Sequence, residues 1–174
     1  VVDPVMVAKS GDHLLAQSAV AMLREALLPL ALVVTPNLPE AGVLLGRPAP
    51  DGVRGMYQAA ERLRALLPSS GEHWVLLKGG HLAGDTVVDL LHDGDRMIEL
   101  SGPRVATRNT HGTGCTLSAA IAALLPQRSA EPSPVEAAVR GARDYLLGAL
   151  RAADRLDVGS GHGPVHHFHA LWPS

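Results

Sequence analysis

Residues 109–120 read NTHGTGCTLSAA, and this stretch is the strongest local pattern of the chain. Two glycines, Gly112 and Gly114, stand at the start of a run of small residues with helical character. Glycines before a helix let backbone amides converge on an anion, and the helix dipole favours negative charge there. The stretch predicts a helix over 113–125 with a phosphate-binding start, although a plain glycine-rich turn with a buried Cys115 would have the same sequence. The P-loop pattern G-x-x-x-x-G-K-[ST] is absent from the sequence, which excludes an ordinary P-loop NTPase.

Outward from this stretch, short apolar runs alternate with segments of helical spacing. The predicted strands are 1–2, 31–34 and 73–77, followed by a hairpin over 86–100 that turns at Asp93-Gly94. The predicted helices run from Gly11-Asp12 to Pro29, from Pro39 to Gly46, from a cap at Asp51 to Leu67, and over 113–125 and 134–153. Helices that alternate with continuous apolar strands predict an α/β layered fold with a mostly parallel central sheet.

Polar groups follow the three predicted single strands directly. Asp3, the turn with Asn37 and Glu40, and Lys78 each stand just after one of these strands. In open α/β sheets, ligands collect outside the carboxyl ends of the strands. We therefore expect these groups to meet at one edge of the sheet and to bind a ligand there.

The composition limits the classes of function. The chain has 174 residues, 47% of them hydrophobic and 18% charged, which predicts one folded domain over 1–174. A net charge of −2 and only 3% aromatic residues argue against a nucleic-acid partner. The longest apolar run, 26–34, is far shorter than the ~20 residues that cross a bilayer, so no membrane partner is expected. The single cysteine, Cys115, excludes an internal disulfide and favours a cytoplasmic protein.

Five segments together resemble the hydroxymethylpyrimidine and phosphomethylpyrimidine kinases of thiamine biosynthesis, in the ribokinase-like superfamily. In the family's order, they read VDPVMVAKSG at 2–11, TPNLPEA at 35–41, LKGGH at 77–81, NTHGTGCTLSAA at 109–120 and GHGP at 161–164. The resemblance implies a ribokinase-like layered α/β/α fold. Relatives carry an earlier part with the first βαβ units, so we expect 1–174 to be a single kinase domain that is incomplete at its N-terminus.

The resemblance assigns catalysis to two of these segments. Gly112, Thr113 and Gly114 resemble the anion hole whose amides face the transferred phosphoryl group, and Thr113 and Gly114 thereby also contact ATP. Cys115 stands where sugar kinases of the superfamily carry an aspartate base, and in the pyrimidine kinases it lies beside the substrate hydroxymethyl group. Lys78 resembles the lysine that reaches the transferred phosphates of ATP, while a surface lysine in a turn is the alternative.

The resemblance also implies metal and substrate contacts near the start of the chain. Asn37 and Glu40, in N-x-x-E spacing, resemble the Mg²⁺ motif of the superfamily, and Asp3 resembles the aspartate near the metal and the phosphates. Val5 and Met6 resemble part of the pyrimidine pocket wall. Simpler alternatives are turn initiation for Asp3, a favourable helix-start carboxylate for Glu40, and plain packing for Val5 and Met6.

The implied function is therefore phosphoryl transfer with ATP and Mg²⁺ as cofactors and a small-molecule pyrimidine as substrate. The acceptors would be 4-amino-5-hydroxymethyl-2-methylpyrimidine and then its monophosphate. Relatives are commonly homodimers, so a homodimer is expected. Two alternatives stay open at this point: a pyridoxal kinase of the same superfamily, and a truncated homologue that binds nucleotide without catalysis.

Overall fold

The computed structural model describes residues 1–6 and 15–172, so the predicted helix start at Gly11-Asp12 lies outside the described residues. Residues 7–11 of the first family-like segment lie outside them as well. The chain divides into two compact units, Val1–Pro103 and Arg104–Ser174. In the ranges that are described, no helix is long and apolar enough to cross a membrane.

The sheet of the first unit is mostly antiparallel, which corrects the expectation of a mostly parallel sheet. Its described strands follow the order β1 (Val33–Val34), β2 (Trp74–Leu77), β3 (Thr86–His92) and β4 (Met97–Pro103). Among them, β1 and β2 pair in parallel, and Val2 bridges to Val34 in the same direction, whereas β2–β3 and β3–β4 are antiparallel. The reason is the length of the connections. Helices join β1 to β2, but the loops from β2 to β3 and from β3 to β4 are too short for the crossover that parallel pairing requires.

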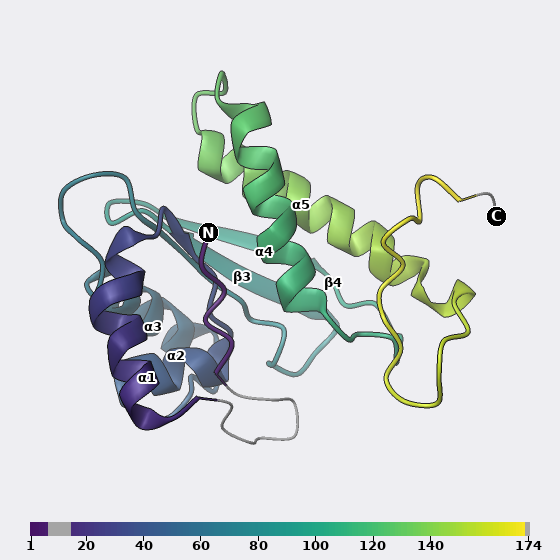
Figure 1. Ribbon diagram of the computed structural model, residues 1–174, viewed down its shortest axis with the longest axis horizontal. Helices are drawn as coiled ribbons and strands as arrows, with labels where there is room; N and C mark the ends of the chain where they lie inside the picture. The colour runs from purple at the N-terminus through teal and green to yellow at the C-terminus, as the bar shows by residue number, and fades with distance from the viewer. Residues whose placement is uncertain (7–14, 173–174) are drawn as a thin grey trace. The chain divides into compact units, whose positions relative to one another are not determined.

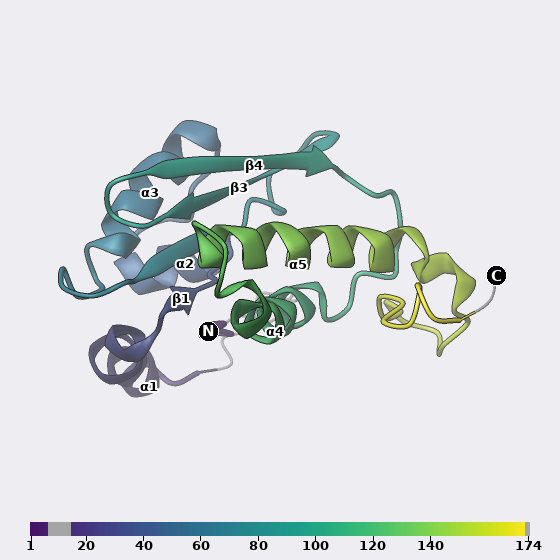
Figure 2. The same ribbon diagram turned by 90° about the horizontal axis from the view of Figure 1, so that it is seen from above.

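Helix α3 (Val53–Arg64) covers β2 and β3, and α2 (Leu38–Leu45) packs beside α3 (Figures 1 and 2). Met56, Ala60 and Leu63 recur at helical spacing on one face of α3, and all three are buried. They belong to the same hydrophobic core as apolar residues of β2 and β3. This core fixes the strands whose ends carry Asp3, Glu40 and Lys78.

The helix that the sequence predicts up to Pro29 is not uniform. Helix α1 (Gln17–Met22) continues into a π-helical turn, η1 (Leu23–Leu27), and a 3-10 turn, η2 (Leu28–Leu30). Pro29 lies in the first turn of η2, where its missing N–H is tolerated. The predicted cap at Asp51 is also displaced by one residue, because Gly52 is the N-cap of α3 and no side chain caps this helix.

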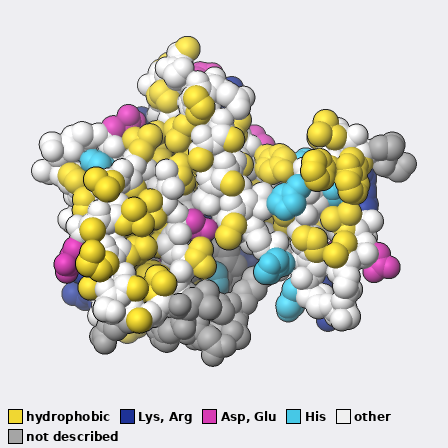
Figure 3. Space-filling view, in the orientation of Figure 1, with side chains coloured by type: hydrophobic (Ala, Val, Ile, Leu, Met, Phe, Trp, Pro, Cys, Tyr) yellow, Lys and Arg dark blue, Asp and Glu magenta, His cyan; other side chains and the backbone are white. Residues whose placement is uncertain are grey.

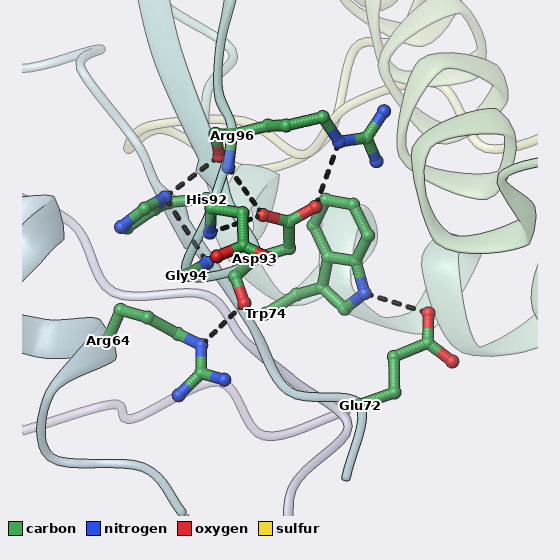
Figure 4. Close-up of polar contacts among 8 residues, drawn as sticks. Arg64, Glu72, Trp74, His92, Asp93, Gly94 and Arg96 are labelled. Atoms are coloured by element: carbon green, nitrogen blue, oxygen red, sulfur yellow. Dashed lines mark hydrogen bonds and ion pairs between the residues drawn. The ribbon is translucent and has the colours of Figure 1, made fainter. Parts of the chain in front are cut away.

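The β3–β4 hairpin turns at Asp93-Gly94, as predicted. Asp93 Oδ1 accepts the N–H groups of Asp95 and Arg96 at 2.9 and 2.7 Å, and Gly94 has a φ of 115°, which favours glycine. Arg64 of α3 donates from Nε to the Asp93 carbonyl at 2.8 Å (Figure 4). Burial alone raises the pKa of the Asp93 carboxyl, but the Arg96 and Asp95 amides and the Arg96 guanidinium outweigh it and hold the pKa below its usual value.

Two helices that pack side by side form the second unit (Figures 1 and 2). The helices are α4 (Thr113–Leu124) and α5 (Pro134–Arg151), followed respectively by the 3-10 turns η3 (Leu125–Arg128) and η4 (Ala153–Arg155). Leu117 and Ile121 of α4 are buried, as are Val135, Ala138 and Ala142 of α5. Small residues in the interface allow the two helices to approach closely.

The tail after η4 packs on α5 through a backbone hydrogen bond and a ring contact. The His166 N–H donates to the Ala149 carbonyl at 3.0 Å, and the His169 ring lies 5.3 Å from the Tyr145 ring. Figure 3 shows His side chains gathered with hydrophobic ones on this part of the second unit. These histidines therefore take part in packing.

Candidate active site

The strand-end groups of the first unit meet at one edge of the sheet. Lys78 Nζ donates to Asp3 Oδ1 at 2.8 Å, and the hydroxyl of the buried Thr35 donates to the same oxygen at 3.0 Å. The side chains of Lys78 and Asp3 are only 13% and 12% exposed. Glu40 is held at the same edge through Asn37, which bridges to Lys78 and whose N–H donates to Glu40 Oε2. Three residues from distant parts of the sequence thus form one charged cluster.

The backbone pairing explains why these groups meet. The Val2 N–H donates to the Val33 carbonyl at 2.8 Å, and the Thr35 N–H donates to the Val2 carbonyl at 2.9 Å. On the other side of β1, the Lys78 N–H donates to the Pro36 carbonyl at 2.8 Å. Because the carboxyl ends of parallel strands lie at the same edge, the residues that follow them lie together.

Asn37 and Glu40 form a capping box at the start of α2. Asn37 Oδ1 accepts the Glu40 N–H at 2.9 Å, and Glu40 Oε2 accepts the Asn37 N–H at 2.7 Å. Burial raises the pKa of the Glu40 carboxyl; the Asn37 amide and the Lys78 charge oppose this, and the Asp3 charge adds to it. The helix-start alternative therefore holds for Glu40. A bound cation would stabilise the same carboxylate, so both roles are compatible.

The oxygen atoms of this cluster fit Mg²⁺. The contacts above use Asp3 Oδ1 and Glu40 Oε2, which leaves Asp3 Oδ2 and Glu40 Oε1 as hard donors. In the described part of the chain, no three or more His, Cys, Asp or Glu side chains form a group that could hold a metal. Mg²⁺ commonly takes one or two carboxylates together with phosphate oxygens and water. The metal role of Asp3, Asn37 and Glu40 stays a prediction of that kind.

Val5 and Met6 have different surroundings. Met6 is 1% exposed and belongs to the hydrophobic core of the first unit, so packing accounts for it. Val5 is 43% exposed and lies two residues after Asp3, whose carbonyl accepts its N–H at 2.9 Å. The substrate role of both residues stays a prediction.

In the second unit, Gly112 is the N-cap of α4 with a φ of 80°, a conformation that favours glycine. No side chain caps this helix, and a Cβ at Gly112 would meet no atom within 4 Å. The first amides, from Thr113 and Gly114, are therefore not engaged by a capping side chain. Cys115 is exposed, so the reading of this stretch as a turn with a buried cysteine is wrong. The catalytic roles of these residues stay predictions.

The GHGP segment of the tail joins the loop before α4. The His111 N–H donates to the Gly163 carbonyl at 3.1 Å, and His111 forms a parallel bridge with Pro164. A Cβ at Gly163 would overlap the side-chain amide of Asn109, so a larger residue at this position would displace Asn109. The segments 109–120 and 161–164, which the family resemblance names separately, are therefore parts of one structure.

The sequence did not single out three residues that organise the charged cluster of the first unit and the loop before α4. Thr35 donates to Asp3, Asp89 Oδ1 accepts the Gly79 N–H at 2.9 Å, and Asp154 Oδ1 accepts from Asn109 Nδ2 at 3.0 Å. A carboxylate within the apolar run VVDLL was a usable signal for Asp89. No comparable local pattern surrounds Asp154, whose partner is distant in sequence.

Comparison with known proteins establishes the family. A sequence model of the phosphomethylpyrimidine kinase family matches residues 1–166. The chain belongs to this family. The match confirms the resemblance that the five segments predict, and it covers every residue proposed for the two sites.

Relatives and solved structures agree with this family. The hydroxymethylpyrimidine/phosphomethylpyrimidine kinases of Rhizobium meliloti and Escherichia coli are 55% and 49% identical to the chain over 172 residues. In both cases the match covers 99% of the chain but only 62% of the relative, so the chain spans about three fifths of their length. An ADP complex of Bacillus subtilis pyridoxal kinase has a TM-score of 0.82 at 35% identity, over 97% of this chain and 60% of that one. The likeness confirms a ribokinase-like α/β fold.

Proposed function

We propose that the protein is a hydroxymethylpyrimidine and phosphomethylpyrimidine kinase. It transfers the γ-phosphoryl group of ATP to 4-amino-5-hydroxymethyl-2-methylpyrimidine and then phosphorylates the monophosphate. The observation that carries the proposal is the Lys78–Asp3 pair, 2.8 Å between Nζ and Oδ1, at the sheet edge of a chain that matches this family. Because the chain spans 62% of its relatives, the activity is proposed for the complete protein.

Lys78 supplies the positive charge of the proposed reaction. A compact ammonium suits the oxygens of a transferred phosphoryl group, on which charge is spread in a loose transition state. Asp3 holds this ammonium at 2.8 Å, and so orients it before a nucleotide binds. The loss of the Lys78 charge should therefore affect phosphoryl transfer more than it affects the binding of the pyrimidine.

Asp3, Asn37 and Glu40 are the residues proposed to hold Mg²⁺. When bound, Mg²⁺ neutralises charge on the phosphate oxygens of ATP. Asn37 fixes the start of α2 and, through the capping box, the place of the Glu40 carboxylate. The raised pKa of Glu40 supports this role, since a cation beside it would offset the unfavourable burial of its charge.

The start of α4 is proposed to bind the phosphoryl group through the amides of Gly112, Thr113 and Gly114. Such donors stabilise the charge that develops in the transition state, and the N-cap residue Gly112 has no side chain that would cap this helix. Cys115 follows in the first turn with an exposed side chain, and we assign it to the hydroxymethyl group of the substrate. Val5 and Met6 are assigned to the wall of the pyrimidine pocket.

An assay of the complete protein with ATP, Mg²⁺ and both pyrimidines tests the function. We expect formation of the pyrimidine diphosphate, and a decrease in kcat of about 100-fold or more in Lys78→Ala. The exposed Arg62 on α3 offers a matched control, and Arg62→Ala should leave kcat unchanged. Absence of the diphosphate product contradicts the proposal, and ATP binding without transfer would instead favour a non-catalytic homologue.

A pyridoxal kinase is the second candidate, favoured by the structural likeness to the Bacillus subtilis enzyme of that name. Parallel measurements of kcat/KM with pyridoxal and with the hydroxymethylpyrimidine separate the two activities. A higher kcat/KM for the pyrimidine supports the first proposal, and a higher value for pyridoxal supports the second.

Three further properties are proposed. The family resemblance supports a homodimer and a single kinase domain over 1–174 that is incomplete at its N-terminus, and the single cysteine supports a cytoplasmic location. Sedimentation of the complete protein tests the homodimer, the cooperativity of unfolding tests the single domain, and fractionation of the source cells tests the location.

A further inference from the structure

We propose that Asp89 is a positioning residue for Lys78, which rests on the proposed role of Lys78 in phosphoryl transfer. Asp89 lies within β3 and is only 6% exposed. Its Oδ1 accepts the N–H of Gly79, the residue after Lys78, at 2.9 Å. A buried carboxylate is costly unless hydrogen bonds satisfy it, so this residue type in an apolar strand indicates a specific task.

The ladder between β2 and β3 ends where Asp89 acts. Its pairs include Leu76 with Leu91 and Leu77 with Leu90, and the next residues in register would be Lys78 and Asp89. Lys78 instead bridges to Asn37 on the opposite side. The Asp89 side chain therefore keeps the segment after Leu77 bound to β3, beyond the point where the backbone ladder ends.

Close packing at Gly79 fixes the same segment. A Cβ at Gly79 would overlap the carbonyl of Val88, the residue before Asp89, and would lie 2.9 Å from the Met56 side chain. The backbone of Gly79 therefore lies directly against β3. Its amide can reach the Asp89 carboxylate only because this position carries no side chain.

These contacts define the backbone of Lys78 from both directions. Its own N–H donates to the Pro36 carbonyl at 2.8 Å, and the following N–H donates to Asp89. At the other end of the residue, the Lys78 ammonium donates to Asp3 Oδ1 at 2.8 Å, which fixes the position of the charge. In a loose phosphoryl-transfer transition state, catalysis depends on placement, and a small displacement of a charged group can be costly. Asp89 thus acts on the reaction through Lys78 without touching the nucleotide.

Kinetics of the complete protein test this proposal with three variants. Asp89→Leu replaces the acceptor with a larger apolar side chain, and Asp89→Asn keeps both the size and an oxygen for the Gly79 N–H. Leu100→Val changes a buried residue paired with Asp89 on β4. We expect D89L to lower kcat by about 30- to 100-fold, with KM for the pyrimidine little changed. D89N should stay within about 5-fold of the wild-type kcat, and L100V should match it. If D89L does not fold, Asp89→Ala takes its place.

A double-mutant cycle with Lys78→Ala separates positioning from general stability. If Asp89 acts through Lys78, D89L should cause no further loss of kcat in the K78A background. An equal loss in both backgrounds, or a wild-type kcat for D89L, overturns the proposal. If K78A itself retains the wild-type kcat, the proposed function of Lys78 fails, which is a different result from a failure of Asp89 alone.

Discussion

Glu40 serves the fold and the proposed metal site with one carboxylate. Its Oε2 accepts the Asn37 N–H at 2.7 Å and so satisfies an amide at the start of α2. Burial nevertheless disfavours its charge, and the pKa in the folded state lies above 4.5. A side chain held where its charged form is unfavourable is typical of functional sites.

We expect Glu40→Gln to remove a pH-dependent component of stability. Because the pKa of Glu40 is raised above 4.5, ionisation destabilises the fold, and the free energy of unfolding falls as the pH rises through the folded-state pKa. Glutamine keeps an oxygen for the Asn37 N–H and carries no charge. Urea titrations from about pH 4 to pH 8 measure the effect, with the exposed Glu61→Gln as control. A wild-type-minus-E40Q difference that stays constant with pH contradicts this expectation.

The Asp3–Lys78 pair has a structural role that can be separated from its proposed role in phosphoryl transfer. Lys78→Met leaves the Asp3 carboxylate, 12% exposed, without its cation, which should cost about 1–3 kcal/mol of unfolding free energy. Adding Asp3→Asn removes the unpaired charge, so the double variant should recover most of this stability but no phosphoryl transfer. Thermal unfolding and the kinase assay measure the two properties. Recovery of both would place Lys78 outside the reaction.

At the scale of elements, the β3–β4 hairpin has the opposite pH response. The pKa of Asp93 lies below 3.8, so its carboxylate contributes stability that is complete above that pH and is lost as the pH falls through the folded-state pKa. Asp93→Asn should destabilise the protein at neutral pH by about 0.5–1 kcal/mol and have little effect near about pH 2. Denaturant unfolding at both pH values measures this, with the exposed Asp95→Asn as control. A larger cost of D93N at low pH would refute it.

The start of α4 gives a prediction about backbone strain. Gly112 has a φ of 80°, and a Cβ there meets no neighbouring atom, so Gly112→Ala should be destabilised by conformation alone, by about 1–2 kcal/mol. Gly161 also has open space around a Cβ but no left-handed φ, and Gly161→Ala is the matched control. Calorimetry of both variants should show the lower Tm in G112A. Equal Tm values would mean that φ is not the cause.

Local patterns predicted those elements whose signals lie within a few residues. The hairpin followed from Asp93-Gly94, and the core face of α3 followed from the spacing of its apolar residues. The prediction of a mostly parallel sheet was wrong, because the connections from β2 to β3 and from β3 to β4 are too short for a parallel crossover. The Asp89–Gly79 hydrogen bond could not be predicted, since it needs the register of β2 against β3. The prediction that Asp3, Glu40 and Lys78 meet succeeded because parallel strand ends share an edge.

At the scale of the whole molecule, nucleotide binding should appear as stability. A ligand that binds only the folded state at 100 times its Kd adds about 2.7 kcal/mol to the free energy of unfolding. We expect MgATP to raise the Tm of the complete protein, and removal of Mg²⁺ with EDTA to reduce the increase. Asp3→Asn should weaken the Mg²⁺ dependence. A Tm that does not respond to MgATP would argue against a nucleotide site.

The division into Val1–Pro103 and Arg104–Ser174 assigns the proposed chemistry to different parts of the chain. The first unit contains the charged cluster of Asp3, Glu40 and Lys78, and the second contains the start of α4. The effect on kcat of a substitution in the charged cluster can therefore be compared with the effect of a substitution at the start of α4.

Cys115 has a practical consequence for spectroscopy. It is the single thiol of these 174 residues, and its side chain is exposed in the first turn of α4. A thiol-reactive fluorophore or a trifluoromethyl tag would therefore label this chain at one position, without the removal of other cysteines. Such a reporter would lie next to the helix start proposed to bind phosphate, so its signal could follow nucleotide occupancy in real time.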